Sequence, residues 1–506
     1  MKNMRRITMK VLAATLLLVL AGGFAAAQDN MSDLEITNAV DDELIGDQAV
    51  PATKIDVMTT DGIVTLDGIV NNILAKDRAE KLALRIKGVR GVINGIDVMA
   101  PLRDDEDIKE NVLDALLWDP VTELWELTAT VDDGKVTLEG TVDSRQEKQL
   151  AEKVVKGVRG VRAVDNQLIV EYDTERPDSE IREEVKQALR WDVYVDDTLI
   201  DVTVDDSKVT LEGTVGSAAE KREATREAWV AGVSNVDNQL DVKYWARDEK
   251  LRKDKYVEMS DEQVEEAVRD ALLYDPRVLS FDIQVEADAG YVTLRGKVDN
   301  FKAKRAAAND ARNVVGVWGI KNQIKVRPST TPSDSKIEQR VENALLNDPY
   351  VALYEVDVTV IDGEVFLYGT VDSAFEKAQA DDVAASVRGV LDVNNYLVVR
   401  DEAFTGYDPY SDEWYPYDYR WYSDLTPTTA KSDWQLRRDI ADLLYWSPYV
   451  DRDKIEIQVD DGIVTLEGEV ETWTERLEAR EKALNAGAVV VNNNIEVEYG
   501  PDFNTD

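Results

Sequence analysis

The chain has 506 residues and a formal net charge of −42, because 101 acidic residues outnumber 59 basic ones. The electrostatic field of this negative charge repels nucleic acids, so we expect no nucleic-acid partner. Adhesion to an anionic membrane would need a divalent-cation bridge or a locally basic patch. The absence of His and Cys from the sequence excludes His- and Cys-dependent catalysis, disulfides and the usual zinc ligands. The length exceeds what one core supports, so we expect several domains.

Residues 1–27 predict a secretory signal peptide. A basic start is followed by a short apolar run and by three alanines, Ala25 to Ala27, which is the pattern of a peptide cleaved near Ala27. The alternative is an uncleaved N-terminal anchor, which the short apolar run disfavours. No later stretch is apolar enough to cross a bilayer, so we expect an exported protein with no transmembrane anchor after cleavage, and we expect it in the periplasm.

A short pattern then recurs six times, and each copy begins with an amphipathic helix. In the second copy Ile108, Val112 and Leu116 lie at helical spacing on one face. Asp119-Pro120, or a variant of this pair in other copies, ends the helix, because proline disfavours helical geometry in the residue before it.

Two strands joined by a tight turn follow the helix. The segments 127–131 and 136–142 alternate apolar and polar side chains. Asp133-Gly134 between them is a two-residue hairpin signal, because glycine tolerates positive φ.

A second helix and a last strand complete the copy. Ser144 and Glu147 form a capping box, which predicts the start of this helix, and the segment 166–170 predicts the last strand. Because a helix joins the second and third strands, we expect them to pair in parallel. The predicted fold class is α+β, a tandem array of six small sandwiches with two helices on one face of a three-stranded mixed sheet.

Two glycines recur in every copy at a separation of 19 or 20 residues, and we expect them to serve backbone geometry rather than chemistry. The glycines at the end of the hairpin are Gly68, Gly140, Gly213, Gly296, Gly369 and Gly468. The glycines that end the second helix are Gly88, Gly160, Gly232, Gly316, Gly389 and Gly487.

The copies define six units, numbered 1 to 6 in chain order. Their predicted bounds are 32–100, 104–172, 178–244, 259–327, 333–400 and 432–499. Two longer spacings predict a linker at 245–258 and an insert at 401–431 that is dense in Tyr, Trp, Pro and Asp. The insert is either a strip for partner recognition or an ordered strap that lies on neighbouring units.

The repeated pattern resembles the BON domain, a module of bacterial envelope proteins that includes the osmotically inducible periplasmic protein Y family. The likeness is carried by the Val-x-Asp-Gly-x-Val-Thr-Leu-x-Gly hairpin and the Gly-Val-x-x-Val-x-Asn-x-Leu-x-Val exit. It implies an αββαβ fold, a periplasmic location and non-enzymatic work on the envelope under osmotic or related stress. It also implies envelope proteins or a phospholipid surface as partners, although the acidity of this chain opposes unassisted phospholipid binding.

An aromatic residue precedes the helix-ending Asp or Ser in four units. These candidate binding residues are Trp118, Trp191, Tyr274 and Trp446. One interpretation is an interfacial aromatic that docks lipid, peptide or glycan, and the other is a residue that closes the edge of the sandwich core.

Acidic hairpins such as Asp132-Asp133 and Asp460-Asp461 offer oxygen ligands for calcium. Turn formation explains these residues equally well, and no spaced ligand set accompanies them, so we expect no metal, no cofactor and no catalytic residues. The predicted function is a non-enzymatic, multivalent binding and scaffold protein of the periplasm. The alternatives are a chaperone-like protector of envelope proteins and a phospholipid-associating protein.

Overall fold

The computed structural model describes ten segments of the chain: 31–122, 127–171, 176–247, 259–278, 283–328, 331–351, 356–399, 431–460, 462–488 and 490–497. The predicted signal peptide at 1–27 lies outside the described residues, as do most of the 245–258 linker and all but the last residue of the 401–431 insert.

Each unit has the order helix, strand, strand, helix, strand, which confirms the predicted fold class. Unit 1 consists of α2 (Asp33–Gly46), β1 (Ile55–Thr60), β2 (Ile63–Val70), α3 (Ile73–Leu84), β3 (Gly91–Asn94) and β4 (Asp97–Val98). Unit 2 consists of α4 (Asp105–Trp118), β5 (Leu127–Asp132), β6 (Lys135–Val142), α5 (Arg145–Lys156), β7 (Ala163–Asn166) and β8 (Ile169–Val170). Unit 3 consists of α6 (Asp178–Trp191), β9 (Ile200–Asp205), β10 (Lys208–Val215), α7 (Ala218–Glu227), β11 (Asn235–Asn238) and β12 (Asp241–Val242).

The second half of the chain repeats this order. Unit 4 consists of α8 (Asp261–Tyr274), β13 (Ile283–Asp288), β14 (Tyr291–Val298), α9 (Phe301–Arg312) and β15 (Gly319–Val326). Unit 5 consists of α10 (Asp334–Asn347), β16 (Val356–Ile361), β17 (Glu364–Val371), α11 (Ala374–Ala385), β18 (Asp392–Asn395) and β19 (Val398–Val399). Unit 6 consists of α12 (Asp433–Trp446), β20 (Ile455–Asp460), β21 (Ile463–Val470), α13 (Trp473–Asn485), β22 (Val490–Asn493) and β23 (Glu496–Val497).

The second strand is the centre of each sheet. In unit 2, β6 is antiparallel to β5, with Leu138 opposite Ala129, and parallel to β7, with Leu138 opposite Asn166. The expected parallel pairing is therefore present, and the sheet is mixed. The helices cover one face, where Val136 and Leu138 are completely buried against Ile108 and Val112, so the alternating strand pattern and the helical spacing meet in one core.

The hairpin turn is held by the first helix. In unit 2 both carboxylate oxygens of Asp105 accept hydrogen bonds of 2.9 Å, from the backbone amides of Asp133 and Gly134. Asp133 itself has a φ of +48° and pairs with Arg162 at 2.8 Å. The hairpin carboxylate of unit 2 thus takes part in turn geometry and in an ion pair.

An asparagine in the exit strand links the sheet to the second helix. In unit 2 the side-chain amide of Asn166 donates to the carbonyl of Lys148 at 2.8 Å, and its oxygen accepts from the amide of Leu168 at 3.3 Å. The same donor bond recurs at Asn94, Asn238, Asn322, Asn395 and Asn493. The asparagine of the exit motif therefore fixes the last strand on its helix.

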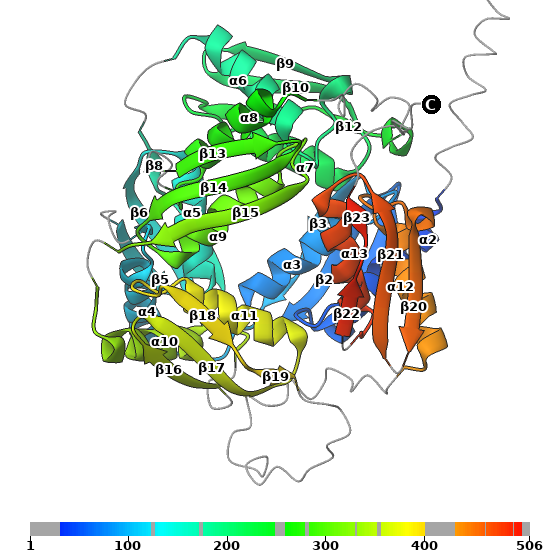
Figure 1. The fold of residues 1–506 in the computed structure, drawn as a ribbon. Helices are drawn as coiled ribbons and strands as arrows, with labels where there is room; N and C mark the ends of the chain where they lie inside the picture. The colour runs from blue at the N-terminus through cyan, green and yellow to red at the C-terminus, as the bar shows by residue number, and fades with distance from the viewer. Residues whose placement is uncertain are drawn as a thin grey trace, which may run out of the picture.

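The six units fold back on one another in nested order, so that unit 1 lies beside unit 6, unit 2 beside unit 5 and unit 3 beside unit 4 (Figure 1). The helices α2 and α12 are in contact, as are α4 and α10. In Figure 1 the blue first unit and the red last unit meet on one side of the molecule, and the sheets of units 4, 5 and 6 face outward around the helices.

The recurring glycines adopt left-handed backbone geometry. The hairpin-end glycines have φ between +126° and +145°, and the helix-ending glycines have φ between +86° and +103°. At Gly468 a Cβ atom would lie 2.1 Å from the carbonyl oxygen of Lys454, whereas at Gly487 nothing lies within 4 Å of that position. Gly468 is therefore required by both backbone conformation and close approach, and Gly487 by conformation alone.

This contrast within unit 6 gives a prediction. Gly468→Ala adds a steric clash to the backbone strain and should destabilise the unit by about 2 kcal/mol or more, whereas Gly487→Ala should cost about 1 kcal/mol. Urea unfolding of both variants beside the parent protein measures the difference. Equal losses for the two variants would contradict the role of the close approach.

Candidate functional site: the unit interfaces and the central cavity

Units 2 and 5 exchange backbone hydrogen bonds in a twofold manner. The amide of Arg388 in unit 5 donates to the carbonyl of Trp118 in unit 2 at 3.1 Å, and the amide of Arg159 in unit 2 donates to the carbonyl of Asn347 in unit 5 at 2.6 Å. The two donors precede equivalent glycines, and the two acceptors precede equivalent helix-ending aspartates. The interface between units 2 and 5 is therefore isologous, as in a symmetric dimer.

The other two pairs use the same positions. The amide of Val315 in unit 4 donates to the carbonyl of Trp191 in unit 3 at 2.9 Å. The amide of Lys87 in unit 1 donates to the carbonyl of Trp446 in unit 6 at 3.0 Å. Unit 1 carries Gly46 where four other units carry an aromatic residue, and a Cβ atom there would lie 2.9 Å from the carbonyl oxygen of Asn485. The glycine thus permits the close approach of unit 6.

Three of the four candidate aromatic residues lie at these interfaces, all half-buried. Trp191 packs against the core of unit 4, and Trp446 packs against the core of unit 1. The guanidinium of Arg340 in unit 5 lies 6.0 Å from the ring centre of Trp118. Tyr274 ends α8, and its side chain is outside the described part of the structure. Neither interpretation from the sequence included contacts between units, and a ligand-binding role for these residues stays a prediction.

The side chain of Arg159 strengthens the interface between units 2 and 5. Its guanidinium donates to the carbonyl of Asp348 at 2.7 and 3.2 Å and to the carbonyl of Val351 at 2.9 Å. Charged donors make stronger hydrogen bonds than neutral ones. Arg159 therefore ties the turn that follows α5 of unit 2 to the turn that follows α10 of unit 5.

The carboxyl of Asp348 is buried at this same interface. Burial raises its pKa to about 6, although a hydrogen bond from Gln379 at 2.7 Å opposes the rise. The other carboxyl oxygen accepts from the amides of Tyr350 and Val351, at 2.8 and 3.1 Å. Asp348 is therefore a turn-forming residue whose ionisation is disfavoured by its surroundings.

A buried ionic cluster joins units 1 and 6. Lys482 of unit 6 lies 2.5 Å from Glu43 of unit 1 and 3.6 Å from Glu478, and Arg85 lies 3.3 Å from Glu478. Burial raises the pKa of Glu43 even though Lys482 opposes that rise. Loss of one partner would leave a buried charge uncompensated, which costs about 3–5 kcal/mol. The cluster makes the contact between the first and last units specific.

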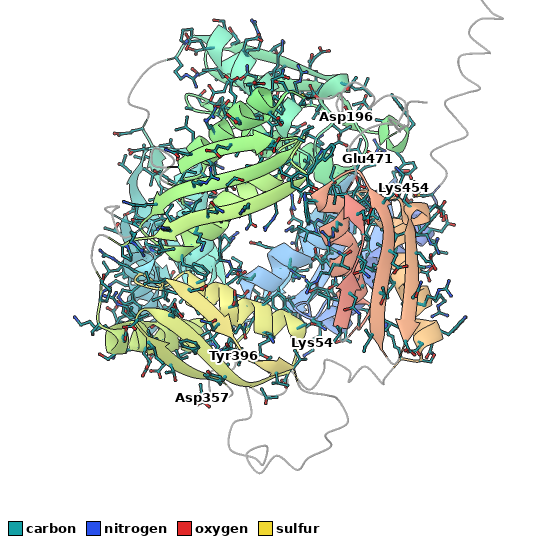
Figure 2. All side chains as sticks on the ribbon, viewed as in Figure 1. Lys54, Asp196, Asp357, Tyr396, Lys454 and Glu471 are labelled. Carbon is teal, nitrogen blue, oxygen red and sulfur yellow. The ribbon has the colours of Figure 1, made fainter. Side chains whose placement is uncertain are left out.

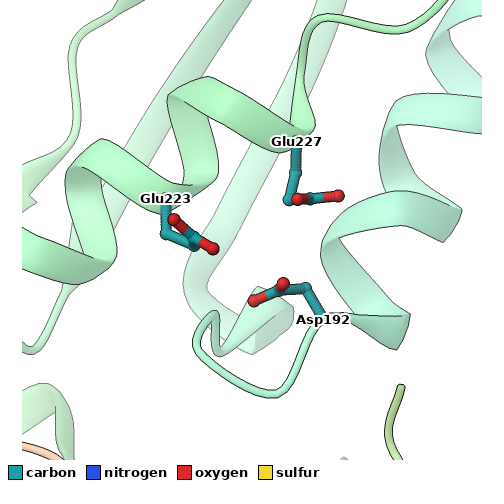
Figure 3. A group of neighbouring side chains, drawn as sticks. All are labelled: Asp192, Glu223 and Glu227. Atoms are coloured by element: carbon teal, nitrogen blue, oxygen red, sulfur yellow. The ribbon is translucent and has the colours of Figure 1, made fainter. Parts of the chain in front are cut away.

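A group of three carboxylates lies in unit 3, close to unit 4. Oxygen atoms of Asp192, Glu223 and Glu227 lie within 4.8 Å of one another (Figure 3). The guanidinium of Arg226 contacts all three, at 3.5, 2.5 and 2.7 Å respectively. Burial opposes ionisation of Arg226, but the carboxylates prevail and raise its pKa. The guanidinium of Arg226 already contacts each carboxylate of the group, so the arrangement is an ion-pair network rather than an open cation site.

The helices of units 1 to 5 surround a cavity of about 1180 Å³. Its wall includes three indole rings, those of Trp118, Trp191 and Trp229. The sheets form the outside of the molecule, where Asp357 and Tyr396 of unit 5 are exposed (Figure 2). The helices thus line a space, open to solvent, that no single unit possesses. Within the ten described segments no helix is long and apolar enough to cross a membrane.

The BON domain family matches this chain six times. The matched residues are 32–100, 104–172, 177–244, 260–328, 333–401 and 432–499. The chain belongs to the BON-domain family. The predicted resemblance is therefore confirmed, and each unit described above is a BON unit.

Three curated relatives share part of this repeat. The osmotically-inducible protein Y of Escherichia coli is 32% identical over 145 residues, which is 28% of this chain and 72% of that protein. The 21 kDa hemolysin of Actinobacillus pleuropneumoniae is 34% identical over 149 residues, 28% of this chain and 76% of that protein. The outer membrane lipoprotein DolP of Haemophilus influenzae is 30% identical over 142 residues, 27% of this chain and 73% of that protein.

Arg159 provides a test of the pairing of BON units 2 and 5. Arg159→Ala removes the charged hydrogen bonds to unit 5, so the amide of Arg388, which crosses the same interface, should exchange with solvent about tenfold faster. Hydrogen–deuterium exchange on the full chain measures this. Arg162→Ala is the matched control, because Arg162 pairs within unit 2 with Asp133. Unchanged exchange at residue 388 in Arg159→Ala would contradict the interface.

The buried carboxyl of Asp348 predicts that the folding stability of the protein falls as the pH rises. The pKa of Asp348 in the folded protein is about 6, which exceeds the ordinary value of 3.8. The stability that the protonated carboxyl gives the folded protein is therefore present in full below about pH 4 and is lost as the pH rises through 6. The loss is roughly 3 kcal/mol. Asp348→Asn should remove this dependence, so the melting temperature of the variant relative to the parent should rise between pH 4 and pH 7. Asp357→Asn on the exposed outer sheet is the control, and a constant difference for Asp348→Asn across this range would refute the prediction.

Proposed function

We propose that this BON-domain protein is a non-enzymatic, multivalent binding scaffold of the bacterial periplasm that supports the cell envelope under osmotic or related stress. The names of two relatives support this envelope location and this stress condition, since one is named as osmotically inducible and another as an outer membrane lipoprotein. Six copies of one unit favour repeated weak binding, in which linked sites raise the overall affinity without new contacts.

The observation that carries this proposal is the outward orientation of the sheets, several of which expose apolar side chains. On unit 1 Met58 and Ile93 flank Thr65 across the sheet and are 64% and 58% exposed. On unit 5 the rings of Tyr368 and Tyr396 stack with centres 5.3 Å apart. On unit 6 the neighbours Ile463 and Val490 are also exposed. Such residues on separate faces give one body several similar contact surfaces.

The other two functions have less support from the geometry. A chaperone that binds clients through the candidate aromatic residues would have to separate paired units, because Trp191 and Trp446 pack against neighbouring cores. Phospholipid association is opposed by the net charge of −42. The scaffold is therefore the function that the arrangement of units supports best.

The test uses the full chain with one, two or three altered faces. The substitutions are Met58→Ser with Ile93→Ser, then Tyr368→Ser with Tyr396→Ser, then Ile463→Ser with Val490→Ser. Cosedimentation with isolated cell envelopes at high osmolarity should weaken stepwise, by about threefold or more for each face removed. Leu477→Ser, an exposed apolar residue on α13, is the control. Undiminished cosedimentation of the triple-face variant would refute multivalent binding through the sheets.

A further inference from the structure

Two of the six sheets carry like charges at directly opposite positions of neighbouring strands. In unit 4 Lys297 on β14 is the register partner of Lys325 on the parallel strand β15. In unit 6 Glu469 on β21 is the register partner of Glu496 on β23. All four side chains are exposed, and both sheets lie on the outside of the molecule (Figure 1). Like charges that face each other across a sheet repel, so each pair opposes the folding of its own unit.

The two pairs occupy the same place in the repeat. Lys297 and Glu469 each follow the hairpin-end glycine of their unit. The other four units have no pair of like charges at these two positions. The residues there are Ile69 with Asp97, Thr141 with Ile169, Thr214 with Asp241, and Thr370 with Val398. The two units that carry a charged pair therefore carry opposite signs at equivalent positions.

Neither pair is neutralised inside the molecule. Within the described segments no ion pair or hydrogen bond reaches the two ammonium groups or the two carboxylates. Charged residues nearby do have partners, since Arg295 is bonded to Glu286 and the ammonium of Lys454 lies 3.1 Å from a carboxylate oxygen of Glu471. The four charges are therefore available to a partner that approaches from solvent.

The rest of each outer face has the same sign as its pair. On the strands of unit 4 the exposed basic residues outnumber the exposed acidic ones. They are Arg295, Lys297, Lys321 and Lys325 against Glu286 and Asp288. On the described strands of unit 6 the exposed charged residues are all acidic. They are Glu456, Asp460, Glu467, Glu469 and Glu496. One chain of net charge −42 thus presents a positive sheet and a negative sheet of the same fold.

A second copy of the chain carries the surface that matches. Neighbouring strands are about 4.8 Å apart in any sheet, so the two lysines and the two glutamates have the same spacing. When the sheet of unit 4 lies on the sheet of unit 6 from another copy, each lysine meets a glutamate, and the repulsion within both sheets is relieved. An anionic bilayer matches less well, because it is wide enough to meet the other units of this acidic chain as well.

We propose that the sheet of unit 4 binds the sheet of unit 6 of a second copy, with Lys297 and Lys325 on one side of the contact and Glu469 and Glu496 on the other. The two surfaces differ, so the contact is heterologous and leaves one free face at each end. Copies therefore associate head to tail into chains longer than a dimer. The net charge of each copy opposes this association at long range, but at physiological salt exposed charges more than about 8 Å apart are largely screened.

Sedimentation velocity of the full chain tests this contact without envelope material, so the result does not depend on the function proposed above. The parent protein should form concentration-dependent oligomers that dissociate in about 1 M salt, where the Debye length is about 3 Å. Lys297→Glu with Lys325→Glu should weaken association about tenfold or more, and so should Glu469→Lys with Glu496→Lys, because like charges then meet across the contact. Each reversal keeps the repulsion within its own sheet, so both variants should melt at the temperature of the parent.

An equimolar mixture of the two variants is the decisive measurement. Each variant alone has two faces of one sign, whereas the mixture offers opposite faces, so the mixture should associate as the parent does. Lys135→Glu with Lys208→Glu makes the same change in net charge on the exposed strands β6 and β10 and is the control.

Three outcomes would overturn the proposal: a parent that stays monomeric at every concentration, a control that loses association equally, or a mixture that fails to associate. If a monomeric parent binds anionic vesicles and the reversal of the two lysines abolishes that binding, the positive sheet contacts a membrane instead of a second copy.

Discussion

The assembly depends on a backbone contact that recurs between paired units. In that contact the residue before the helix-ending Asp or Ser offers its carbonyl to the residue before the helix-ending glycine of another unit, as Trp118 does to Arg388. Because main-chain groups make this contact, it tolerates variation of the side chains at both positions. The repeat therefore carries its own means of association, and side chains determine which units associate. The cluster of Glu43, Lys482 and Glu478 belongs to one pair, and the guanidinium of Arg159 belongs to another.

Much of each unit could be predicted from the sequence, because local signals act within it. The spacing of Ile108 and Val112 and the turn at Asp133-Gly134 each specify an element through nearby residues, and the structure has those elements. The turn also depends on Asp105, whose role was not foreseen because 28 residues separate it from Asp133. A recurrent acid at the start of each first helix was the available signal.

The candidate site was harder to predict, because it lies between units and not within one. Trp118 and Trp446 were singled out by their recurrence, but no local pattern shows which unit an aromatic residue meets. Unit 1 has Gly46 at the position where four other units have an aromatic residue. A glycine there was a usable signal that a neighbouring unit approaches the backbone closely. The central cavity could not be predicted either, since its wall forms only when the helices of five units are in place.

Nested pairing also has a consequence for the order in which the protein is made. Units 3 and 4 are neighbours in the chain, so they can associate as soon as both have emerged, and units 2 and 5 can follow. Unit 1 emerges first but must wait for unit 6, whose Lys482 lies 439 residues beyond Glu43. During that interval its half of the ionic cluster stays in water, where charged groups are well solvated. The ionic part of this last interface therefore leaves no charge buried and unpaired in unit 1 before unit 6 is available.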